Sequence, residues 1–502
     1  MLVVPFRHLA RISLLSSFIL LAWGDSRSTW GDDTQTPGSL AAQVGKLAKD
    51  APAKTAAIYI AEANSTTPLV NLDGETPVKP ASCNKLLTTA ASFSLLGPDH
   101  IFETKIYAKG TITNGTLKGD LILQGGGDPT ISGRFAKEKR DTTHNLRDWA
   151  EQLKAKGISR VTGNVIGDDS YFDENYFHSG WYGGERGEWY EAEISGLAFN
   201  DNCVDIAWSS KDLMPGDEAR YVLNPKTNYA TFINHVKVAA KGRPVERYYE
   251  RDATSNDIVA SGTLEYDFTK DDSASIHNGA LYMATVFKDV LTSTGIKVDG
   301  DAKQTRGAAD EKNLSLLVTH KSAPLSEVAK VINLNSQNFY AECFCKTLGK
   351  VKKNSGSFED GASVVAQFVR DHHIFHEGYN PVDGSGLSAQ NNVTARQLVE
   401  TLQFMDKQPF AAKWRETIPQ GQVRGSLKRR FGETSESQRL APRIYGKTGL
   451  IGGVRSLSGW VTLPSGKEYY YSLILNGISE RNGNKAVEFL DKVALAIAGV
   501  EP

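Results

Sequence analysis

Residues 80–98 read PASCNKLLTTAASFSLLGP: a proline, a run of small and apolar residues, and a closing Gly-Pro pair. Proline favours the start of a helix and glycine the position just after its end, so this stretch predicts one helix over residues 81–96. Ser82 and Lys85 lie three positions apart at its start, on one face of the helix. The lysine amine can therefore reach the serine hydroxyl, as a base reaches its nucleophile. The alternative is a capping serine followed by a solvated lysine.

The segments on either side of this helix predict a shared sheet. Four stretches have the short apolar or alternating pattern of strands: residues 55–60, 69–72, 456–463 and 469–475. Residues 39–49 and 485–498 have helical spacing instead. We expect the two ends of the chain to meet in one antiparallel sheet with helices on its faces. The middle of the chain is then an insertion.

The middle of the chain predicts mixed strands and loops. From residue 104 apolar and polar residues alternate, and Asn114-Gly115 between two such runs is a strong signal for a hairpin turn. Strands and loops continue to about residue 310, through a loop rich in glycine and aromatic residues at 179–190. Helical spacing returns after this region, at residues 326–334, 339–348 and 361–372.

Composition and charge exclude several classes of protein. With 40% hydrophobic and 23% charged residues over 502 positions, the chain is typical of a globular protein with roughly two to four domains. Its net charge of −1 excludes a general affinity for nucleic acid. Four cysteines are too few for a disulfide scaffold, and we expect mostly free, buried thiols at Cys83, Cys203, Cys343 and Cys345.

Residues 1–24 predict a signal peptide. Arg7 and Arg11 precede an apolar run over residues 12–23, and Ala22 and Gly24 are the small residues that a cleavage site needs. The run is shorter than the roughly 20 residues that span a bilayer, so no stable membrane span remains after cleavage. An uncleaved anchor is the alternative. We expect an exported protein of the periplasm or cell envelope.

Two further polar triplets stand out along the chain. Ser336-Gln337-Asn338 joins two predicted helices, where it can point into a cleft, and Lys447-Thr448-Gly449 comes just before the last two predicted strands. A polar helix-joining turn and a lysine-rich turn are the structural alternatives. The order Ser-x-x-Lys, Ser-x-Asn, Lys-Thr-Gly is, however, the motif set of serine β-lactamases and penicillin-binding proteins.

On these motifs the chain resembles the low-molecular-mass class C penicillin-binding proteins, the D-alanyl-D-alanine carboxypeptidase/endopeptidase family. Four longer stretches also resemble segments of that family, in the family's order: residues 80–97, 119–130, 168–173 and 383–388. The resemblance covers roughly residues 40–500. The 254 positions between Ser82 and Ser336 agree with it, because class C proteins carry two extra domains there.

The resemblance implies a mixed α/β (α+β) fold with a β-lactamase/transpeptidase-like domain, an antiparallel sheet flanked by helices. Residues 25–98 and 311–502 would form this catalytic domain. Two mostly β domains would be inserted into it. Residues 99–175 and 276–310 would form the first, and residues 176–275 the second, nested in the first.

The resemblance also implies the roles of five residues in a serine DD-peptidase that acts on peptidoglycan stem peptides and is inhibited by β-lactams. Ser82 would attack the penultimate D-alanine carbonyl to form an acyl-enzyme, and Lys85 would take its proton. Lys447 would lower the pKa of Lys85 as a nearby like charge. Ser336 would relay a proton to the leaving amine, and Asn338 would hold the substrate amide and orient Lys85. No metal or organic cofactor is implied.

Substrate binding is implied at the strand that follows Lys447. Thr448, Gly449 and Leu450 would line it, with the oxyanion held by the backbone N–H groups of Ser82 and Leu450. Leu450 replaces the usual Thr or Ser whose hydroxyl helps to bind the terminal carboxylate. This departure favours cross-link cleavage or slow turnover over carboxypeptidase action, although Thr448 and Arg455 could still hold the carboxylate.

Two other clusters need an interpretation. Asp168 or Asp169 would bind a free amine of the stem peptide by resemblance, with a capped turn as the equal alternative. His372, His373 and His376 look like a metal cluster, but they follow a helix C-terminus, where histidines complement the helix dipole.

Two rival functions remain. The first is a β-lactamase, which would differ by fast deacylation, and no glutamate in this sequence resembles the class A deacylating base. The second is a catalytically silent protein that binds the cell wall. The intact motif residues argue against this second rival, because drift would be expected to break at least one of them.

Overall fold

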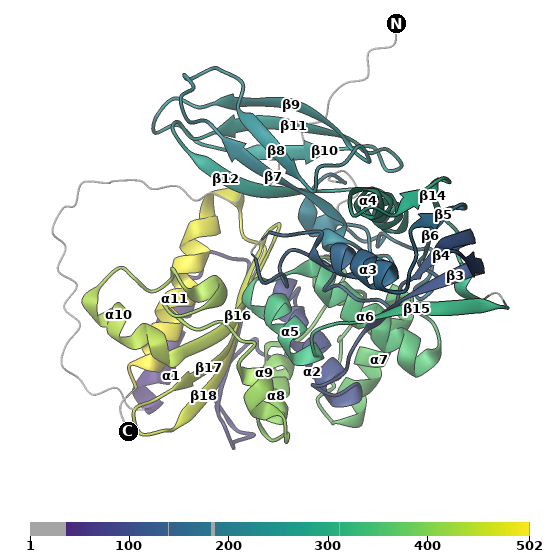
Figure 1. Cartoon of the computed structure of the whole chain (residues 1–502). Coiled ribbons are helices and arrows are strands. Elements are labelled where there is room, and N and C mark those ends of the chain that lie inside the picture. The colour runs from purple at the N-terminus through teal and green to yellow at the C-terminus, as the bar shows by residue number, and fades with distance from the viewer. Residues whose placement is uncertain (1–36, 139, 182–185, 311, 501–502) are drawn as a thin grey trace, which may run out of the picture.

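The structure is a computed structural model that describes residues 37–138, 140–181, 186–310 and 312–500 (Figure 1). The two ends of the chain form a five-stranded sheet in the order β16-β17-β18-β1-β2, and each neighbouring pair is antiparallel. The strands are β1 (Thr55–Glu62), β2 (Pro68–Leu72), β16 (Ile444–Ile451), β17 (Val454–Thr462) and β18 (Glu468–Asn476). The predicted sheet shared by both ends of the chain is therefore confirmed.

Helices cover both faces of this sheet (Figure 1). On one face lie α1 (Pro37–Lys49) and α11 (Gly483–Ala498), and on the other lie α2 (Lys85–Leu95), α5 (Leu325–Leu334), α6 (Asn338–Lys353), α7 (Phe358–Asp371) and α8 (Ala395–Asp406). The alternation of side chains along a strand explains the two cores. Ile58 and Ile60 pack with α1 and α11, whereas Ala57 and Tyr59 pack with the larger helical layer.

The helix predicted over residues 81–96 is divided into two parts. Residues Ala81–Asn84 form a 3-10 turn, η1, and α2 begins only at Lys85. Ala81 has a φ of 48°, a left-handed conformation that an α-helix does not contain. In a 3-10 turn the side chains at i and i+3 eclipse one another, so this departure brings Ser82 and Lys85 into closer alignment than the predicted α-helix would.

The middle of the chain begins with a seven-stranded sheet. Its strands are β3 (Glu103–Thr113), β4 (Thr116–Gln124), β5 (Arg160–Val161), β6 (Val165–Asp168), β13 (Lys297–Val298), β14 (Ala302–Gln304) and β15 (Leu314–Lys321). Asn114 and Gly115 both have positive φ angles in the β3-β4 turn, as a hairpin of this type requires. Two helices that the sequence did not predict, α3 (His144–Ala155) and α4 (Gly279–Ser293), pack on this sheet.

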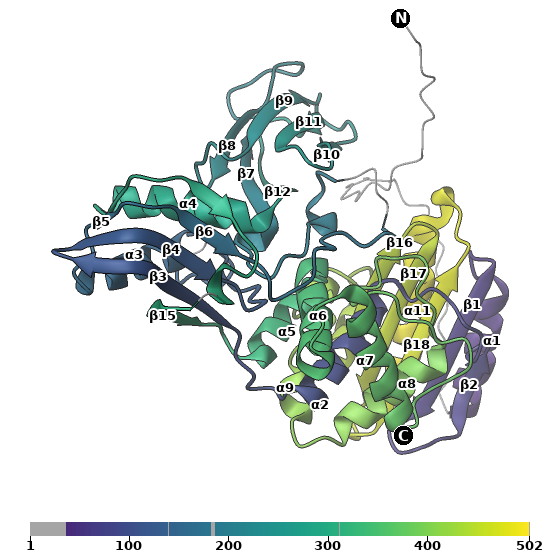
Figure 2. The ribbon, with the colours of Figure 1, turned by 90° about the vertical axis from the view of Figure 1, so that its right-hand side faces the viewer.

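The remaining inserted residues form two three-stranded sheets, which rise above the rest of the molecule in Figure 2. One contains β7 (Cys203–Ser209), β8 (Arg220–Asn224) and β12 (Thr269–Ser275). The other contains β9 (Thr231–Val238), β10 (Arg247–Glu250) and β11 (Asp257–Leu264).

We propose that these parts are two nested insertions, as the sequence suggests, with one border moved. The expected catalytic segment 311–502 begins too early, because β15 pairs with β3 in the inserted sheet. The return to the first sheet and its helices comes after Lys321, with α5.

All four cysteines are free and buried, as expected. The predicted signal peptide lies outside the described residues. Among the described residues, no helix has both the length and the apolar character needed to cross a membrane.

Candidate active site

The three motif segments meet where strand β16 presses against the η1 turn. The Cys83 thiol donates to the backbone carbonyl of Lys447 at 3.1 Å, and the Ser456 hydroxyl donates to the Pro80 carbonyl at 2.7 Å. Gly449 makes this approach possible. A Cβ at this position would lie 2.8 Å from the Pro80 oxygen and 3.0 Å from the Ser82 nitrogen, closer than real Cβ atoms come to backbone. Gly449 was expected to let a ligand approach the strand closely. In the structure it also lets the turn that carries Ser82 pack against the strand.

The Lys447-Thr448-Gly449 triplet lies within a strand rather than before one. It forms the middle of β16, which is at the edge of the five-stranded sheet next to β17; the first residues of β16 also form a bridge between Tyr445 and Gln420. The Thr448 hydroxyl lies 2.8 Å from the hydroxyl of Ser426, a residue that no sequence pattern singled out.

Lys85 is fully buried and is held by three acceptors. Its Nζ lies 2.9 Å from Ser82 Oγ, 2.7 Å from Asn338 Oδ1 and 2.7 Å from the Ser385 carbonyl oxygen. A neutral amine has two N–H groups and one lone pair. If Asn338 and Ser385 accept the two N–H groups, the lone pair is directed at the Ser82 hydroxyl. This is the arrangement that a base needs.

The two motif lysines differ in their electrostatic surroundings. Burial lowers the pKa of Lys85 well below its usual value, and the positive charge of Lys447 lowers it further. Burial also lowers the pKa of Lys447, to about 8. Near neutral pH Lys447 therefore keeps its proton while Lys85 is the more easily neutralised of the two.

Ser336 connects Lys447 to the crevice. The Lys447 ammonium donates to Ser336 Oγ at 2.8 Å and to the Thr448 carbonyl at 2.6 Å. Ser336 has a φ of 59°, an uncommon conformation for a residue other than glycine, and it precedes the start of α6 at Asn338. Strain of this kind concentrates at functional sites.

The inserted region also contributes to this site. The Asn338 amide donates to the Tyr190 carbonyl at 2.9 Å, so a segment of the insertion fixes which way the amide points. The glycine- and aromatic-rich composition of residues 179–190 was the only sequence signal for this contact.

A buried carboxylate supports the third acceptor of Lys85. Glu342 accepts the N–H groups of Gly384 at 2.8 Å and Ser385 at 2.7 Å, and this holds the Ser385 carbonyl against the lysine. Burial raises the pKa of Glu342, and the nearby Asp383 raises it further. Sequence reasoning noticed the segment 383–388 but missed Glu342, since a lone glutamate in a helix gives no signal of burial.

The remaining predicted substrate residues lie in different settings. Leu450 is 40% exposed on β16. Arg455 donates to the backbone carbonyls of Ile451 and Val454, so its guanidinium already has partners within its own hairpin.

Asp168 is fully buried and accepts the backbone N–H groups of Ser170, Gly307 and Ala309 at 2.9–3.0 Å. Its carboxylate thereby ties β6 to the segment after β14, which agrees with the alternative of a capped turn. Asp169 is likewise engaged within the protein, with Gln304 and Arg306.

The histidine cluster is dispersed. His376 lies 2.6 Å from a carboxylate oxygen of Glu400, and His372 packs against Phe404. In the part of the chain that the structure describes, no group of three or more His, Cys, Asp or Glu side chains is arranged to hold a metal ion.

Comparisons with known proteins agree with this geometry. The D-alanyl-D-alanine carboxypeptidase of Actinomadura sp. (strain R39) is 29% identical over 439 residues, which cover 86% of this chain and 78% of that protein. The D-alanyl-D-alanine carboxypeptidase DacB of Haemophilus influenzae is 25% identical over 421 residues, covering 83% of this chain and 84% of the relative.

A crystal structure of penicillin binding protein 4 (dacB) from H. influenzae superposes with a TM-score of 0.75 at 23% identity, over 90% of this chain and 97% of that one. The same protein complexed with a novel β-lactam gives a TM-score of 0.71. These likenesses confirm the predicted fold class.

The profile of the D-Ala-D-Ala carboxypeptidase 3 (S13) family matches residues 40–496. The match confirms the resemblance stated from the motifs and the predicted class of enzyme, a serine-type D-Ala-D-Ala peptidase. Because the match spans nearly all of the described chain, the protein belongs to the D-Ala-D-Ala carboxypeptidase 3 (S13) family.

Proposed function

We propose that Ser82 is the nucleophile of a DD-peptidase that cleaves peptidoglycan stem peptides through an acyl-enzyme. The observation that carries the proposal is the 2.9 Å contact between Lys85 Nζ and Ser82 Oγ, in a site where the other two acceptors of the amine are the neutral oxygens of Asn338 and Ser385. An amine in this setting is readily neutral, and only a neutral amine can act as a base.

The first half of the reaction transfers the peptide to the enzyme. Ser82 Oγ attacks the carbonyl carbon of the penultimate D-alanine while its proton moves to Lys85 Nζ. The carbonyl oxygen becomes an oxyanion, which the N–H groups of Ser82 and Leu450 stabilise. The proximity of Gly449 to the Ser82 nitrogen supports this assignment, because it brings the two backbone segments together.

The leaving amine then needs a proton. Ser336 donates its hydroxyl proton to this nitrogen as the C–N bond breaks, and the Lys447 ammonium, 2.8 Å from Ser336 Oγ, replaces it. Asn338 binds the amide group of the substrate while it orients Lys85. The proton that Lys85 took from Ser82 then passes to the deprotonated Lys447, so that both amines return to their starting states. Water next attacks the acyl carbon while Lys85 takes a proton from it, and Lys85 gives that proton to Ser82 Oγ as the ester bond breaks.

The edge of β16 takes the peptide as an added strand. An edge strand presents unpaired backbone groups, so the backbone of the substrate can form hydrogen bonds with it. Part of the selectivity for the substrate then comes from its backbone conformation. Thr448 and Ser426 offer two adjacent hydroxyl groups for the terminal carboxylate. They partly replace the hydroxyl that Leu450 lacks, which supports both carboxypeptidase and endopeptidase action.

The substrate of such an enzyme lies outside the cytoplasm, and the basic and apolar start of the chain supports export to the periplasm or cell envelope. β-Lactams imitate the D-Ala-D-Ala end and acylate the same serine. No metal or organic cofactor takes part in these steps.

A gel with fluorescent penicillin tests the proposal. We expect a persistent label on the wild-type protein and none on Ser82→Ala, with Ser94→Ala, another serine on the same helical segment, as the matched control. Rapid loss of the label would identify a β-lactamase, and a wild-type protein without label would be a silent wall-binding protein. Digestion of cross-linked and uncross-linked muropeptides, read by product mass, then separates endopeptidase from carboxypeptidase action.

A further inference from the structure

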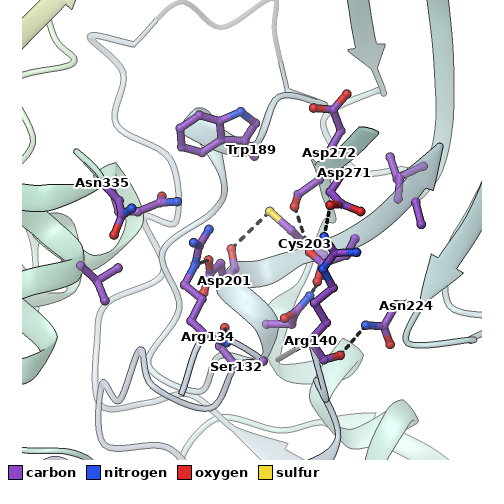
Figure 3. Close-up of a pocket in the computed structure, with 18 residues that line it drawn as sticks. Ser132, Arg134, Arg140, Trp189, Asp201, Cys203, Asn224, Asp271, Asp272 and Asn335 are labelled. Carbon is purple, nitrogen blue, oxygen red and sulfur yellow. Dashed lines mark hydrogen bonds and ion pairs between the residues drawn. The ribbon is translucent and has the colours of Figure 1, made fainter. Parts of the chain in front are cut away.

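A cavity of about 800 Å³ lies between the helical layer and the inserted sheets (Figure 3). Asn335 stands on one side of it and Asp272 of β12 on the other, and Trp189 and Gln337 also line it. Asn335 and Gln337 flank Ser336 in the chain, so the wall of the cavity is continuous with the segment that carries this hydroxyl. A cavity of this volume is typical of a ligand site.

The charged side chains of the cavity have partners within the protein. Of the four carboxylates among the described lining residues, three form ion pairs with guanidiniums. The pairs are Asp201 with Arg134, Asp271 with Arg140, and Asp272 with Arg247, which lies outside the lining.

The fourth carboxylate, that of Asp205, is also compensated. It accepts from the Ser273 hydroxyl at 2.8 Å. Burial raises its pKa to about 6, and the hydrogen bonds of Ser273 and Asn200 and the charge of Arg134 oppose this rise. A charged ligand would leave water for a cavity whose described lining residues offer it no unpaired opposite charge, and this transfer is unfavourable.

The neutral polar groups of the cavity differ from the charged ones. Among the described residues, the side-chain amides of Asn335 and Gln337 and the indole N–H of Trp189 have no hydrogen-bond partner. Gln337 is only 6% exposed, so its amide is largely removed from bulk water. A polar group in this position is satisfied by a ligand or by water. The two amides can donate and accept, and the indole can donate.

We propose that this cavity binds the neutral glycan strand of peptidoglycan, with Asn335 and Gln337 hydrogen-bonded to its hydroxyl and acetamido groups and the ring of Trp189 against the apolar face of a sugar. The inference rests on the proposed function, because it places the glycan to which the cleaved peptide is attached. A stem peptide carries carboxylates, for which the paired charges leave no partner. The glycan offers hydroxyl and N-acetyl groups, and these match the unpartnered neutral groups.

One substrate molecule can reach both sites. About four residues separate the sugar of peptidoglycan from the carbonyl that Ser82 attacks, and an extended chain of that length spans roughly 15 Å. Gln337 in the cavity wall directly follows Ser336, whose Oγ lies 2.8 Å from Lys447 Nζ in the crevice. A stem peptide that starts at a sugar in the cavity can therefore end at Ser82.

The test compares two substrates of the wild-type enzyme. One is the disaccharide GlcNAc-MurNAc with its stem pentapeptide, and the other is the same pentapeptide with an acetylated N-terminus in place of the sugars. Product masses give kcat/KM for each. We expect kcat/KM to be about tenfold higher for the glycan-bearing substrate, in the range of one or two net hydrogen bonds. Equal values overturn the proposal.

Variants then locate the preference. Trp189→Ala is expected to bring the ratio of the two kcat/KM values close to one. Tyr266→Ala, which removes an exposed aromatic ring between β11 and β12 outside the lining, is expected to keep the ratio. A general loss of catalysis lowers both values equally and leaves their ratio unchanged. A ratio that survives in Trp189→Ala overturns the assignment.

A second variant covers the case in which Trp189→Ala does not fold. Ala207 on β7 is exposed and lines the cavity, so a larger side chain there projects into the cavity without entering the protein core. Ala207→Trp is expected to bring the ratio close to one by filling the space of the sugars. An unchanged ratio in this variant overturns the proposal.

Failure of the proposed function is visible separately, as the absence of penicillin labelling and of turnover of both substrates. The glycan site is then tested by calorimetric titration of chitotetraose, a neutral oligomer of N-acetylglucosamine, into Ser82→Ala. We expect binding that is about tenfold weaker when Trp189→Ala is added. No binding, or equal binding with and without Trp189→Ala, overturns the proposal.

Discussion

Two regions of the molecule each bury a lysine completely, and they do so in different ways. Lys346 on α6 lies 2.7 Å from Asp173, donates to the Asn175 carbonyl and stands 4.3 Å above the ring of Phe358. Lys85 has only neutral acceptors. Burial lowers the pKa of both. Asp173 opposes the change at Lys346, whereas at Lys85 the charge of Lys447 adds to it and Glu342 and Asp383 oppose it. A buried lysine in direct contact with a carboxylate is thus a structural cation, and one with only neutral contacts is a candidate base.

The largest expected effect comes from removing the Lys85 amine. Lys85→Met keeps the apolar stem and loses the base, so we expect penicillin acylation to fall by about 10²- to 10⁴-fold, the usual contribution of general base catalysis. The acylation rate constant, with circular dichroism as the check of folding, measures this effect.

Lys346→Met is the matched control, because it also replaces a fully buried lysine. We expect its acylation rate to stay within about twofold of wild type, while the free energy of unfolding falls by about 1–3 kcal/mol, since Asp173 and the Asn175 carbonyl lose their partner. Equal losses of acylation in the two variants would contradict the claim that Lys85 is a base and Lys346 a structural cation.

A smaller effect is expected from Glu342→Gln. The amide cannot accept both N–H groups of Gly384 and Ser385, so the Ser385 carbonyl is held less firmly against Lys85. We expect acylation to slow by about 10- to 100-fold, which corresponds to leaving one buried N–H group without its acceptor. The exposed Glu377→Gln is the control, and a wild-type rate in Glu342→Gln would show that Lys85 needs no such support.

The smallest effect concerns pH. The pKa of Lys447 is lowered to about 8, so its charge is present below that pH and is lost above it. Loss of the charge removes the proton source of Ser336 and lets the pKa of Lys85 rise. We expect the acylation rate to be about tenfold lower at pH 9 than on its plateau, which is the fraction of Lys447 still protonated one unit above its pKa. A rate that rises steadily to pH 10 would contradict this role.

The sequence predicted the parts of the fold that depend on local patterns. The strands at both ends alternate or are wholly apolar, so their meeting in one sheet followed from hydrophobic burial. The spacing of Ser82 and Lys85 predicted their contact. Strand β16 was not among the predicted strands, because Gly446, Lys447 and Gly449 weaken the strand pattern. The two glycines allow close packing against neighbouring atoms.

What could not be predicted depends on contacts between distant segments. The left-handed φ of Ala81, which turns the first residues of the helix into a 3-10 turn, has no signature in an alanine. Glu342 accepts the N–H group of Gly384, and the Tyr190 carbonyl accepts from Asn338. Both contacts join segments that are far apart in the chain, so a pattern within one segment does not predict them. Asp168 lies in a segment that resembles the family, yet its carboxylate accepts backbone N–H groups of the protein itself. The sequence pattern did not predict these contacts either.

The pairing of β1 with β18 has a consequence for biosynthesis. Thr55 lies opposite Asn476, so β1 waits for its neighbour until the residues between the two strands have been synthesised. Such long-range pairing is slow, and a strand edge without its neighbour is exposed to misassembly meanwhile. The edge strand that carries Lys447 joins the same sheet only at that last stage. An incomplete chain therefore has no assembled crevice, and the ability to cut the wall arises together with the final closure of the sheet.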